Sequence, residues 1–564
     1  MKYIIVGGVA GGASTAARLR RIDEHAEIIM FEKGEYISYA NCGLPYYIGN
    51  VIKERDKLFV QTAQSFNSRF NVDVRVSTEV TAIHAANKNI TAVDLKTGKT
   101  YTEHFDKLVI ATGAEPVRPP LPGIRSSKIF TLRNVPDTDA IKTFARQYMG
   151  GKAMVIGAGF IGLEMAENLH HAGIKVTVVE MINQVLAPLD FPIAAIAQQH
   201  LRSKGVKLLL NTAVSAFEET AEGVKVILNN GDENLVDFVL LSIGVKPDTK
   251  LAQGAGLQIG NARGIVVNEF LQTSNPDIYA VGDAIEFKNP ITGKIMNTYL
   301  AGPANKQGRI CADNMVEGNT KKYNGAINTA ILKIFDLTAG ATGMASKHLQ
   351  ALEIEHKIAT VRAGSHASYY PGAKQMTIQI AFSPADGKLL GAQAIGEEGV
   401  DKRLDVLALL IQKQGTIYDL MELEHAYAPP YSSAKDPLNM AGFVAENILK
   451  GVLKLKQWNE FVPALENTPD ALLIDVRAPH EHGPRHIPGS INIPVDELRT
   501  RMNELPKHSP LFVYCEIGLR GYLAQRMLLQ NGYTVYNLSG GYALWEACTA
   551  ETALARSKEF AVPL

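Results

Sequence analysis

The chain has few cysteines, no net charge and no long apolar segment. Its four cysteines lie far apart and form no CxxC pair or Cys/His cluster. That spacing excludes a disulfide-stapled scaffold and any recognisable metal motif, and unpaired thiols are typical of a reducing cytoplasm. Lys plus Arg and Asp plus Glu both number 57, so we expect neither nucleic acid nor an anionic membrane as partner. No segment approaches the roughly 18 apolar residues of a membrane span.

With 564 residues the chain is too long for one hydrophobic core. Its N-terminus follows the pattern of a dinucleotide-binding βαβ unit. An apolar strand, Lys2–Val6, leads into the turn GGVAGG, a helix over Ser14–Ile22, and a second strand, Glu27–Phe31, that ends at Glu32. Such glycines let the backbone approach a pyrophosphate at a helix N-terminus, and the acid binds a ribose. Val9 stands at the middle glycine position, so a simple glycine-rich turn is the alternative.

The same pattern recurs about 150 residues later. Strand Ala153–Ile156, a complete GAGFIG turn, helix Leu163–Ala172 and strand Val176–Val179 precede Glu180. Two copies indicate two dinucleotides, a flavin and a nicotinamide. A carboxylate at Glu180 suits the free 2′-hydroxyl of NADH and would repel the 2′-phosphate of NADPH.

Further strands and helices follow in two blocks. Leu108–Thr112 and Asp277–Asp283 read as strands that end at ligand-facing turns, and Leu300–Val316 as a helix. Residues 326–448 then alternate as strands, for instance Gln375–Phe382, before helices at Gly399–Lys413 and Pro437–Leu449. A new α/β pattern begins after residue 460, with strands Ala471–Val476, Ser490–Ile493, Leu511–Cys515 and Thr534–Asn537 and helices Val495–Asn503 and Gly521–Asn531.

These motifs carry a family resemblance. Residues 1–450 resemble the flavin disulfide reductases through GGVAGG, YANCGLPYYIG, ATGAEP, GAGFIGLE, NPDIYAVGDA, YYPGA and AYAPPYSSAKDP. Within that family they resemble the single-cysteine branch of coenzyme A disulfide reductases, NADH oxidases and peroxidases. Residues 460–555 resemble a rhodanese domain through LLIDVRAPHEH, HIPGSINIP, YCEIGLRGY and LSGGYALW. The combination is similar to coenzyme A disulfide reductases with a rhodanese fusion, some of which reduce persulfides or polysulfides.

The resemblance implies an α/β fold with two Rossmann-like dinucleotide-binding domains, an α+β dimerisation domain and a C-terminal α/β rhodanese domain. The expected boundaries are residues 1–115 and 250–325 for FAD, 116–249 for NADH, 326–450 for dimerisation, 451–460 for a linker and 461–564 for rhodanese. It also implies a homodimer that acts on small sulfur compounds, and the cysteine usage described above predicts a cytoplasmic location.

The resemblance further assigns ligand-binding residues. Those expected at FAD are Gly7, Gly8, Gly11, Gly12, Glu32, Lys33, Thr112, Gly113, Gly282 and Asp283, and those at NADH are Gly157, Gly159, Gly162 and Glu180. Positions that match the family's coenzyme A site are Ser14, Arg18, Arg21, Ser38, Asn41, Asn305, Arg309 and Lys435. An arginine on the first helix can equally belong to a solvated face. Tyr427, with Tyr369 or Tyr370, resembles tyrosines that reach the active site from the second subunit.

Cys42 is the expected redox cysteine. It precedes Gly-Leu-Pro, which reads as a helix start, and nearby N–H groups would lower the thiol pKa there. The position where two-cysteine reductases carry a partner is Tyr47, so Cys42 must rest as a thiolate, a sulfenic acid or a mixed disulfide, for which the family suggests coenzyme A. Ala10 stands where the branch's peroxidases place a histidine, which disfavours a peroxidase.

Cys515 is the expected sulfur carrier. It ends a strand and opens the loop CEIGLR before a helix, where N–H groups can stabilise a thiolate or persulfide and Arg520 would orient the loop. Asp475 and Arg477 are expected to pair structurally, and Glu516 to repel thiosulfate. An inactive rhodanese module is the alternative. Cys311 and Cys548 carry no signature and are expected to be packing residues.

The favoured function is NADH- and FAD-dependent reduction of a coenzyme A persulfide at Cys42, supplied with sulfur by Cys515. Coenzyme A disulfide reduction and NADH oxidation are alternative activities. A redox sensor that binds without turnover is the non-enzymatic alternative. We expect no metal.

Overall fold

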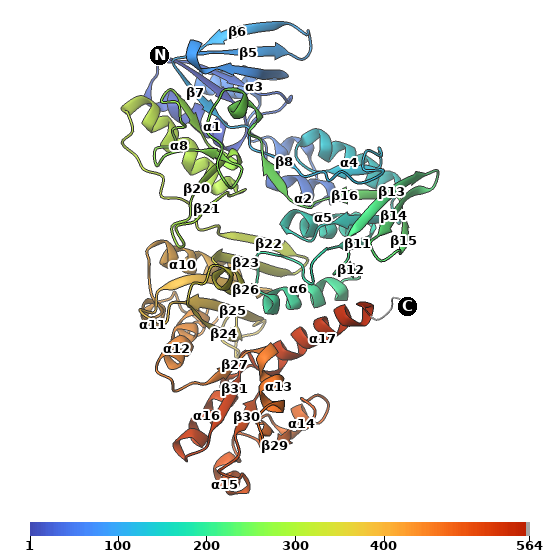
Figure 1. Cartoon of the computed structure of the whole chain (residues 1–564), viewed down its shortest axis with the longest axis vertical. Coiled ribbons are helices and arrows are strands. Elements are labelled where there is room, and N and C mark those ends of the chain that lie inside the picture. The colour runs from blue at the N-terminus through green and yellow to red at the C-terminus, as the bar shows by residue number, and fades with distance from the viewer. Residues whose placement is uncertain (560–564) are drawn as a thin grey trace. The chain divides into compact units, whose positions relative to one another are not determined.

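The computed structural model describes the backbone of residues 1–559 and the side chains of residues 1–555. They form two compact units (Figure 1). The N-terminal unit contains Met1–Val179 and Ala213–Asn328, and the C-terminal unit contains Glu180–Thr212 and the chain from Thr329. The expected α/β fold class is confirmed.

The N-terminal unit is built on parallel sheets. The order of the first is β19-β7-β1-β2-β3, which are Ile278–Ala280, Lys107–Ile110, Lys2–Val6, Glu27–Phe31 and Asp73–Arg75. All of its pairings are parallel. Strands β1 and β2 have the bounds that the sequence predicts, because their apolar residues are buried in one core.

A second parallel set carries the second glycine turn. Strands β11, β10, β16 and β9 lie side by side and are Lys175–Val179, Lys152–Ile156, Phe238–Leu241 and Ile129–Thr131. Each glycine turn leads directly into a helix, α1 (Ala10–Ile22) or α5 (Phe160–His171). A Cβ at Gly12 would lie 1.8 Å from the carbonyl oxygen of Gly7, and one at Gly162 would lie 2.0 Å from that of Gly157. Both positions therefore need glycine for close helix–strand packing.

Helix α8 (Ala301–Glu317) packs along α1. The approach is closest at Gly308, where a Cβ would lie 2.5 Å from the carbonyl oxygen of Gly11 and 3.0 Å from Cβ of Ser14. This contact brings the first turns of the two helices together, and the Ser14 hydroxyl donates to Asn305 Oδ1 over 2.5 Å.

The C-terminal unit begins with an antiparallel sheet. Its order is β22-β23-β26-β25-β24, which are Ala330–Ile334, Leu337–Gly343, Leu389–Gly396, Gln375–Phe382 and Lys357–Gly364. Helices α10 (Val400–Gln412) and α12 (Pro437–Leu449) pack against it, close to the predicted bounds.

The second sheet of this unit is parallel, with the order β27-β31-β30-β28-β29. Its strands are Leu455–Lys456, Val535–Leu538, Leu511–Tyr514, Leu472–Asp475 and Ile491–Asn492, and its helices include α13 (Trp458–Glu466), α14 (Pro479–His482), α15 (Leu498–Arg501), α16 (Leu519–Gln530) and α17 (Gly541–Glu559). The segment 451–460, expected as a linker, thus supplies edge strand β27 and the start of α13. Residues 560–564 of the predicted domain lie outside the described residues.

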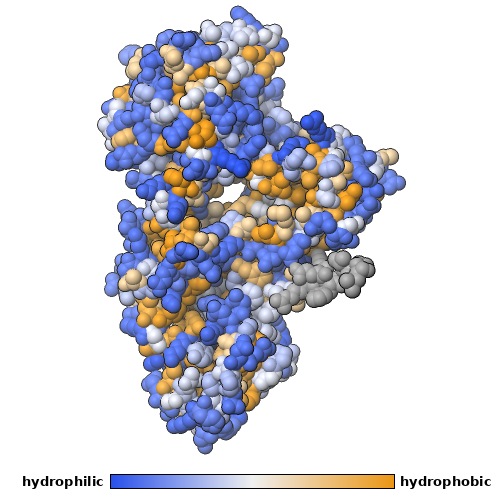
Figure 2. Space-filling view, in the orientation of Figure 1, coloured by the Kyte–Doolittle hydropathy of each residue, from blue (hydrophilic) through white to orange (hydrophobic). Residues whose placement is uncertain are grey.

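Helix α6 (Phe191–Ser203) also belongs to the C-terminal unit, although the sequence assigns it to the NADH domain. It contacts strands β23 and β26 and lies beside α17 (Figure 1). On the visible surface hydrophilic and hydrophobic residues are interspersed (Figure 2), and none of the helices within residues 1–559 is long and apolar enough to cross a membrane.

The contact at Gly308 gives a stability prediction. Replacing Gly308 by Ala should lower the free energy of unfolding by about 1–3 kcal/mol, because the added methyl group forces α8 away from α1. Flavin fluorescence during urea unfolding would report this unit. Gly302→Ala is the matched control on the same helix, since no atom lies within 4 Å of its Cβ position. Equal stability of the two variants would contradict the packing argument.

Candidate functional site

Cys42 lies in the turn Asn41–Gly43, directly before the short helix α2 (Leu44–Ile48). It is the one exposed thiol of the four, since Cys311, Cys515 and Cys548 are buried. Helix α2 packs on α5, and the Tyr46 hydroxyl points to Glu164 Oε1 at 3.5 Å. The sequence did not single out Glu164, although it ends the GAGFIGLE motif.

The surroundings of Cys42 correct one expectation. Desolvation, and then the carboxylates of Glu164 and Asp283, raise the pKa of the Cys42 thiol instead of lowering it. The predicted helix effect is weak because α2 has only five residues. Burial also raises the pKa of Glu164 to about 7 and that of Asp283 to about 6. Cys42 therefore lies beside two carboxyl groups that titrate near neutral pH.

Tyr47, at the position where two-cysteine reductases carry their second cysteine, is a packing residue. It is buried in a cluster with Leu44, Leu58 and Val135. The Lys142 ammonium group lies 3.5 Å from the centre of the Tyr47 ring and donates to the Tyr47 carbonyl oxygen. Desolvation lowers the pKa of Lys142 to about 8. These contacts fix the end of α2 that follows Cys42.

The glycine turns fit a dinucleotide. A Cβ at Gly113 or Gly159 would meet no protein atom within 4 Å, so these glycines leave room for a ligand. Glu32 directly follows β2, and its carboxylate accepts from the N–H of Gly8 at 2.9 Å and of Gly34 at 2.8 Å. This arrangement places an acid beside the first turn, as binding of an adenosine ribose requires.

The other expected FAD residues lie at strand ends. The Thr112 hydroxyl donates to the Asp248 carbonyl oxygen at 2.6 Å, and the Gly282 N–H donates to Gln307 Oε1 at 2.7 Å. Asp283 is half-buried in the turn after β19, whereas Lys33 is exposed. Gly11 packs against Val281, beside that turn.

The expected coenzyme A residues divide into two groups. Ser14 and Asn305 meet across the α1–α8 contact, and Arg309 is exposed one turn after Asn305. Arg18 instead pairs with buried Asp313 of α8, Nε to Oδ1 2.6 Å, which directs its guanidinium group toward that helix. Arg21 is exposed and donates to the Ala17 carbonyl oxygen. Ser38 is half-buried, while Asn41 and Lys435 are exposed; Lys435 is in the C-terminal unit.

A hydrogen bond shows which of Tyr369 and Tyr370 contacts Tyr427. The hydroxyl oxygens of Tyr369 and Tyr427 lie 2.9 Å apart, and both side chains are exposed. The hydrogen bond with Tyr427 raises the pKa of Tyr369. Tyr370 packs edge-to-face on His366 instead. Tyr369, not Tyr370, is therefore the partner of Tyr427.

Cys515 lies at the end of β30, in the core of the parallel sheet. The N–H of Gly518 donates to its sulfur at 3.2 Å, and the Tyr542 N–H donates to its carbonyl oxygen at 2.8 Å. Arg520, in the first turn of α16, makes a bidentate pair with Glu481 at 2.6 and 2.7 Å, which lowers the pKa of Glu481 to about 2. The loop around Cys515 is thus fixed, with an N–H group aimed at the sulfur.

Asp475 and Arg477 form the expected structural pair. Arg477 Nη2 lies 2.8 Å from Asp475 Oδ2, and both side chains are fully buried. Arg477 also reaches Glu516, Nη1 to Oε2 2.9 Å, and Arg485 lies 3.5 Å from the same carboxylate. Glu516 therefore has two arginine partners, which weakens the repulsion of thiosulfate that the sequence predicts for it.

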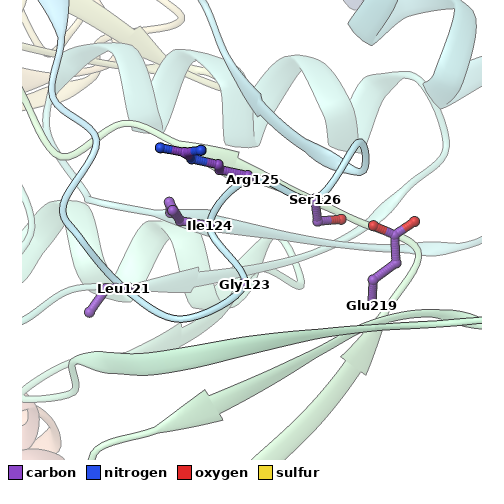
Figure 3. Close-up of a pocket in the computed structure, with 6 residues that line it drawn as sticks. All are labelled: Leu121, Gly123, Ile124, Arg125, Ser126 and Glu219. Carbon is purple, nitrogen blue, oxygen red and sulfur yellow. The ribbon is translucent and has the colours of Figure 1, made fainter.

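The two remaining cysteines lie in apolar clusters. Cys311 contacts the Met315 sulfur and Cys548 packs against Ala195 and Leu544, in agreement with packing roles. Within the described residues no group of three or more His, Cys, Asp or Glu could hold a metal. An open surface cavity of about 350 Å³ (Figure 3) contains none of the expected site residues; it is lined by Leu121, Gly123, Ile124, Arg125, Ser126 and Glu219.

The carboxylate beside Cys42 gives a pH prediction. Glu164→Gln should shift the pH midpoint of Cys42 alkylation by iodoacetamide downward, because the ionised carboxylate raises the thiol pKa. The reduced holoenzyme would be alkylated over a pH series, and the Cys42 peptide measured by mass spectrometry. Glu79→Gln, the same replacement at an exposed position on strand β4 (Thr78–His84), is the control. An unchanged or higher midpoint in Glu164→Gln would contradict the assignment.

The buried pair of the rhodanese domain gives a second prediction. Arg477→Met should destabilise this domain by about 3–5 kcal/mol, because Asp475 loses its main counter-ion in a buried site. Asp475→Asn combined with Arg477→Met should cost less. The two tryptophans, Trp458 and Trp545, report unfolding of the C-terminal unit. Replacing Arg501, which lies in an exposed ion pair, should leave stability unchanged; a similar loss there would refute the prediction.

The comparisons with known proteins agree with this geometry. Residues 1–304 match the pyridine nucleotide-disulphide oxidoreductase model, residues 329–437 its dimerisation domain, and residues 459–548 the rhodanese-like domain. The chain is 33% identical over 445 residues to a coenzyme A disulfide reductase of Staphylococcus aureus (strain JH9), which covers 79% of this chain and 100% of the relative.

Two solved structures extend the likeness through the rhodanese domain. A reduced CoADR-RHD from Bacillus anthracis is 48% identical with a TM-score of 0.95, and the match covers 98% of both chains. An NAD-dependent persulfide reductase from A. fulgidus is 36% identical with a TM-score of 0.91, covering 97% of this chain and 100% of that one. The chain thus belongs to the pyridine nucleotide-disulphide oxidoreductases, flavoenzymes that use FAD and NADH, and carries a rhodanese domain.

Proposed function

We propose that the chain reduces a coenzyme A persulfide with NADH and releases sulfide, and that its rhodanese domain supplies the sulfane sulfur. The observation that carries this proposal is the Cys515 loop, in which the N–H of Gly518 meets the cysteine sulfur at 3.2 Å. An N–H donor at that place stabilises a thiolate or a persulfide anion. Cys515 is also fully buried, which favours the small end of a polysulfide over a bulky disulfide.

The first step loads coenzyme A. Cys515 thiolate attacks a terminal sulfur of a polysulfide, which leaves shortened by one sulfur, and Cys515 becomes a persulfide. The coenzyme A thiolate then attacks the outer sulfur of that persulfide. This restores Cys515 thiolate and forms coenzyme A persulfide without any net change in oxidation state.

The second step takes place at Cys42. Its thiolate attacks the coenzyme A sulfur of the persulfide, the S–S bond breaks, and hydrosulfide leaves. A mixed disulfide between Cys42 and coenzyme A remains. This product fits an exposed cysteine in a chain that has Tyr47 at the position of the second cysteine. FAD would be held by the first glycine turn and Glu32, and it would supply the two electrons, received from NADH as hydride, that return this disulfide to two thiols. The net reaction is coenzyme A persulfide, NADH and a proton giving coenzyme A, hydrogen sulfide and NAD⁺.

Protein groups supply the proton and bind the substrates. The hydrogen-bonded hydroxyls of Tyr369 and Tyr427 are the proposed proton donors to the departing thiol. Ser14, Asn305 and Arg309 are the proposed coenzyme A contacts. Their position where α1 and α8 meet at the surface supports this proposal. We propose a homodimer because the chain contains the family's dimerisation domain and the tyrosine pair is exposed. A reducing cytoplasm is the proposed location.

The decisive experiment is anaerobic NADH oxidation by the purified holoenzyme with coenzyme A persulfide, inorganic polysulfide or coenzyme A disulfide. We expect faster turnover with persulfide and polysulfide than with the disulfide. Cys42→Ser should lower every rate by roughly a thousandfold or more, because it removes the nucleophile. Cys515→Ser should remove the polysulfide reaction with catalytic coenzyme A but spare preformed coenzyme A persulfide.

Three results would contradict the proposal in different ways. Faster turnover with coenzyme A disulfide would make the chain a coenzyme A disulfide reductase, like its Staphylococcus relative. Equal loss of both reactions in Cys515→Ser would refute the division of labour between the two cysteines. Oxygen consumption at full rate without a sulfur acceptor would make it an NADH oxidase.

A further inference from the structure

Helix α17, the last helix of the rhodanese domain, contacts α6, which follows strand β11 in the sequence. Helices α17 and α6 lie side by side (Figure 1). Phe191 of α6 stacks on Trp458 with ring centres 5.2 Å apart, and Ala195 packs against Leu544 and Cys548. Both partners are in the C-terminal unit, so the contact is part of one compact body.

A buried carboxylate lies in this contact. The side chain of Glu551, on α17, is 1% exposed. Its Oε2 accepts from Gln198 Nε2 at 2.8 Å, and its Oε1 lies 3.3 Å from Arg202 Nε. A buried charge is costly unless it is paired in this way. Gln198 and Arg202 are therefore the groups that allow Glu551 to be buried.

From Arg202 a first chain of hydrogen bonds leads to Glu180. Arg202 Nη1 donates to the carbonyl oxygen of Leu208, in strand β12 (Lys207–Leu209), at 3.4 Å. The neighbouring carbonyl oxygen, that of Leu209, accepts from the Glu180 N–H at 2.9 Å, and the Glu180 carbonyl oxygen accepts from the Thr212 N–H at 3.0 Å. Arg202 is thus hydrogen-bonded to strand β12, and the same strand is hydrogen-bonded to the backbone of Glu180.

A second chain runs through Gln198 to the loop after Glu180. The Gln198 side chain is fully buried, and its Oε1 accepts from the Val185 N–H at 3.2 Å. The far end of this loop is also fixed. Asp190 is buried and accepts from the side-chain amides of Gln379 and Gln393, each at 2.6 Å. The loop from Glu180 to Asp190 is therefore held by residues that are remote in sequence.

We infer that Glu551 is a positioning residue for NADH: through Arg202 and Gln198, the rhodanese domain fixes the backbone that carries Glu180. The inference rests on the proposed role of Glu180 at the adenosine ribose. A carboxylate binds a ribose hydroxyl only when its position is set to within a fraction of an ångström. Loss of Glu551 should therefore weaken NADH binding while leaving the chemical step intact.

The test is the anaerobic half-reaction in which NADH reduces the flavin of the holoenzyme, without any sulfur acceptor. Stopped-flow measurement over NADH concentrations separates the dissociation constant from the limiting rate. Glu551→Ala should raise the dissociation constant about five- to tenfold, as expected for a weakened ribose hydrogen bond. The limiting rate should stay within about twofold. Glu551→Gln, which keeps one acceptor oxygen, should give a smaller increase.

Controls separate positioning from general damage. Glu504→Ala removes an exposed ion pair with Arg501 in the same domain and should change neither constant. Tryptophan fluorescence shows whether the C-terminal unit of each variant is folded, and Glu551→Gln serves as the test if Glu551→Ala is not. A limiting rate that falls in parallel with affinity would indicate structural damage and overturn the positioning role.

Glu180→Ala distinguishes this inference from the assignment on which it rests. An increase in the dissociation constant for Glu180→Ala and for the Glu551 variants supports both. An increase for Glu180→Ala alone overturns the role of Glu551 and leaves Glu180 at the ribose. An unchanged constant for Glu180→Ala refutes the role of Glu180, and the positioning inference falls with it.

Discussion

A carboxylate that leaves water must gain hydrogen-bond donors in return, and the C-terminal unit is organised around groups that do so. Asp436 accepts from Arg403 and from the Ser432 hydroxyl, and Asp475 accepts from Arg477. Asp190 and Glu551 receive amide and guanidinium donors. Asp436, Asp190 and Glu551 each join segments that are distant in the sequence, whereas Asp475 fixes the turn that carries Arg477. Removal of one partner would leave a buried charge, so the donors and acceptors fix the arrangement of helices.

Two carboxyl groups near Cys42 respond to burial differently, because their pKa values are raised. Glu164 has only a long contact with the Tyr46 hydroxyl, 3.5 Å, and burial raises its pKa to about 7. The pKa of Asp283 rises to about 6 for the same reason. A carboxyl group that is short of donors responds to burial by holding its proton. The redox cysteine thus lies where the local charge changes near neutral pH. The pKa values of Asp436 and Asp475 are instead lowered, because hydrogen bonds from Arg403 and Arg477 outweigh desolvation.

The fold, and the local geometry of the glycine turns and of the Cys515 loop, could be predicted because the signals are local. The glycine turn before α5 requires Gly162 within a few residues of the strand it packs on, and Cys515 and Gly518 are three residues apart. The raised pKa of Cys42 could not be predicted in this way. It depends first on desolvation and then on the charge of Glu164, which lies near the cysteine because α2 packs on α5. The choice of Tyr369 over Tyr370 likewise needed the contact with Tyr427.

Helix α6 carries polar residues at buried positions, and these indicate that it is covered by other parts of the chain. A helix that only covers a Rossmann sheet needs apolar residues on its inner face, yet α6 buries Gln198 completely and begins at the buried Asp190. Buried polar side chains require partners, and no residue of α6 itself supplies them. Their presence in the predicted NADH domain therefore indicates that other segments cover this helix. Glu551 and Gln379 are those partners, so a helix assigned by sequence to nucleotide binding is held by the dimerisation sheet and the rhodanese domain.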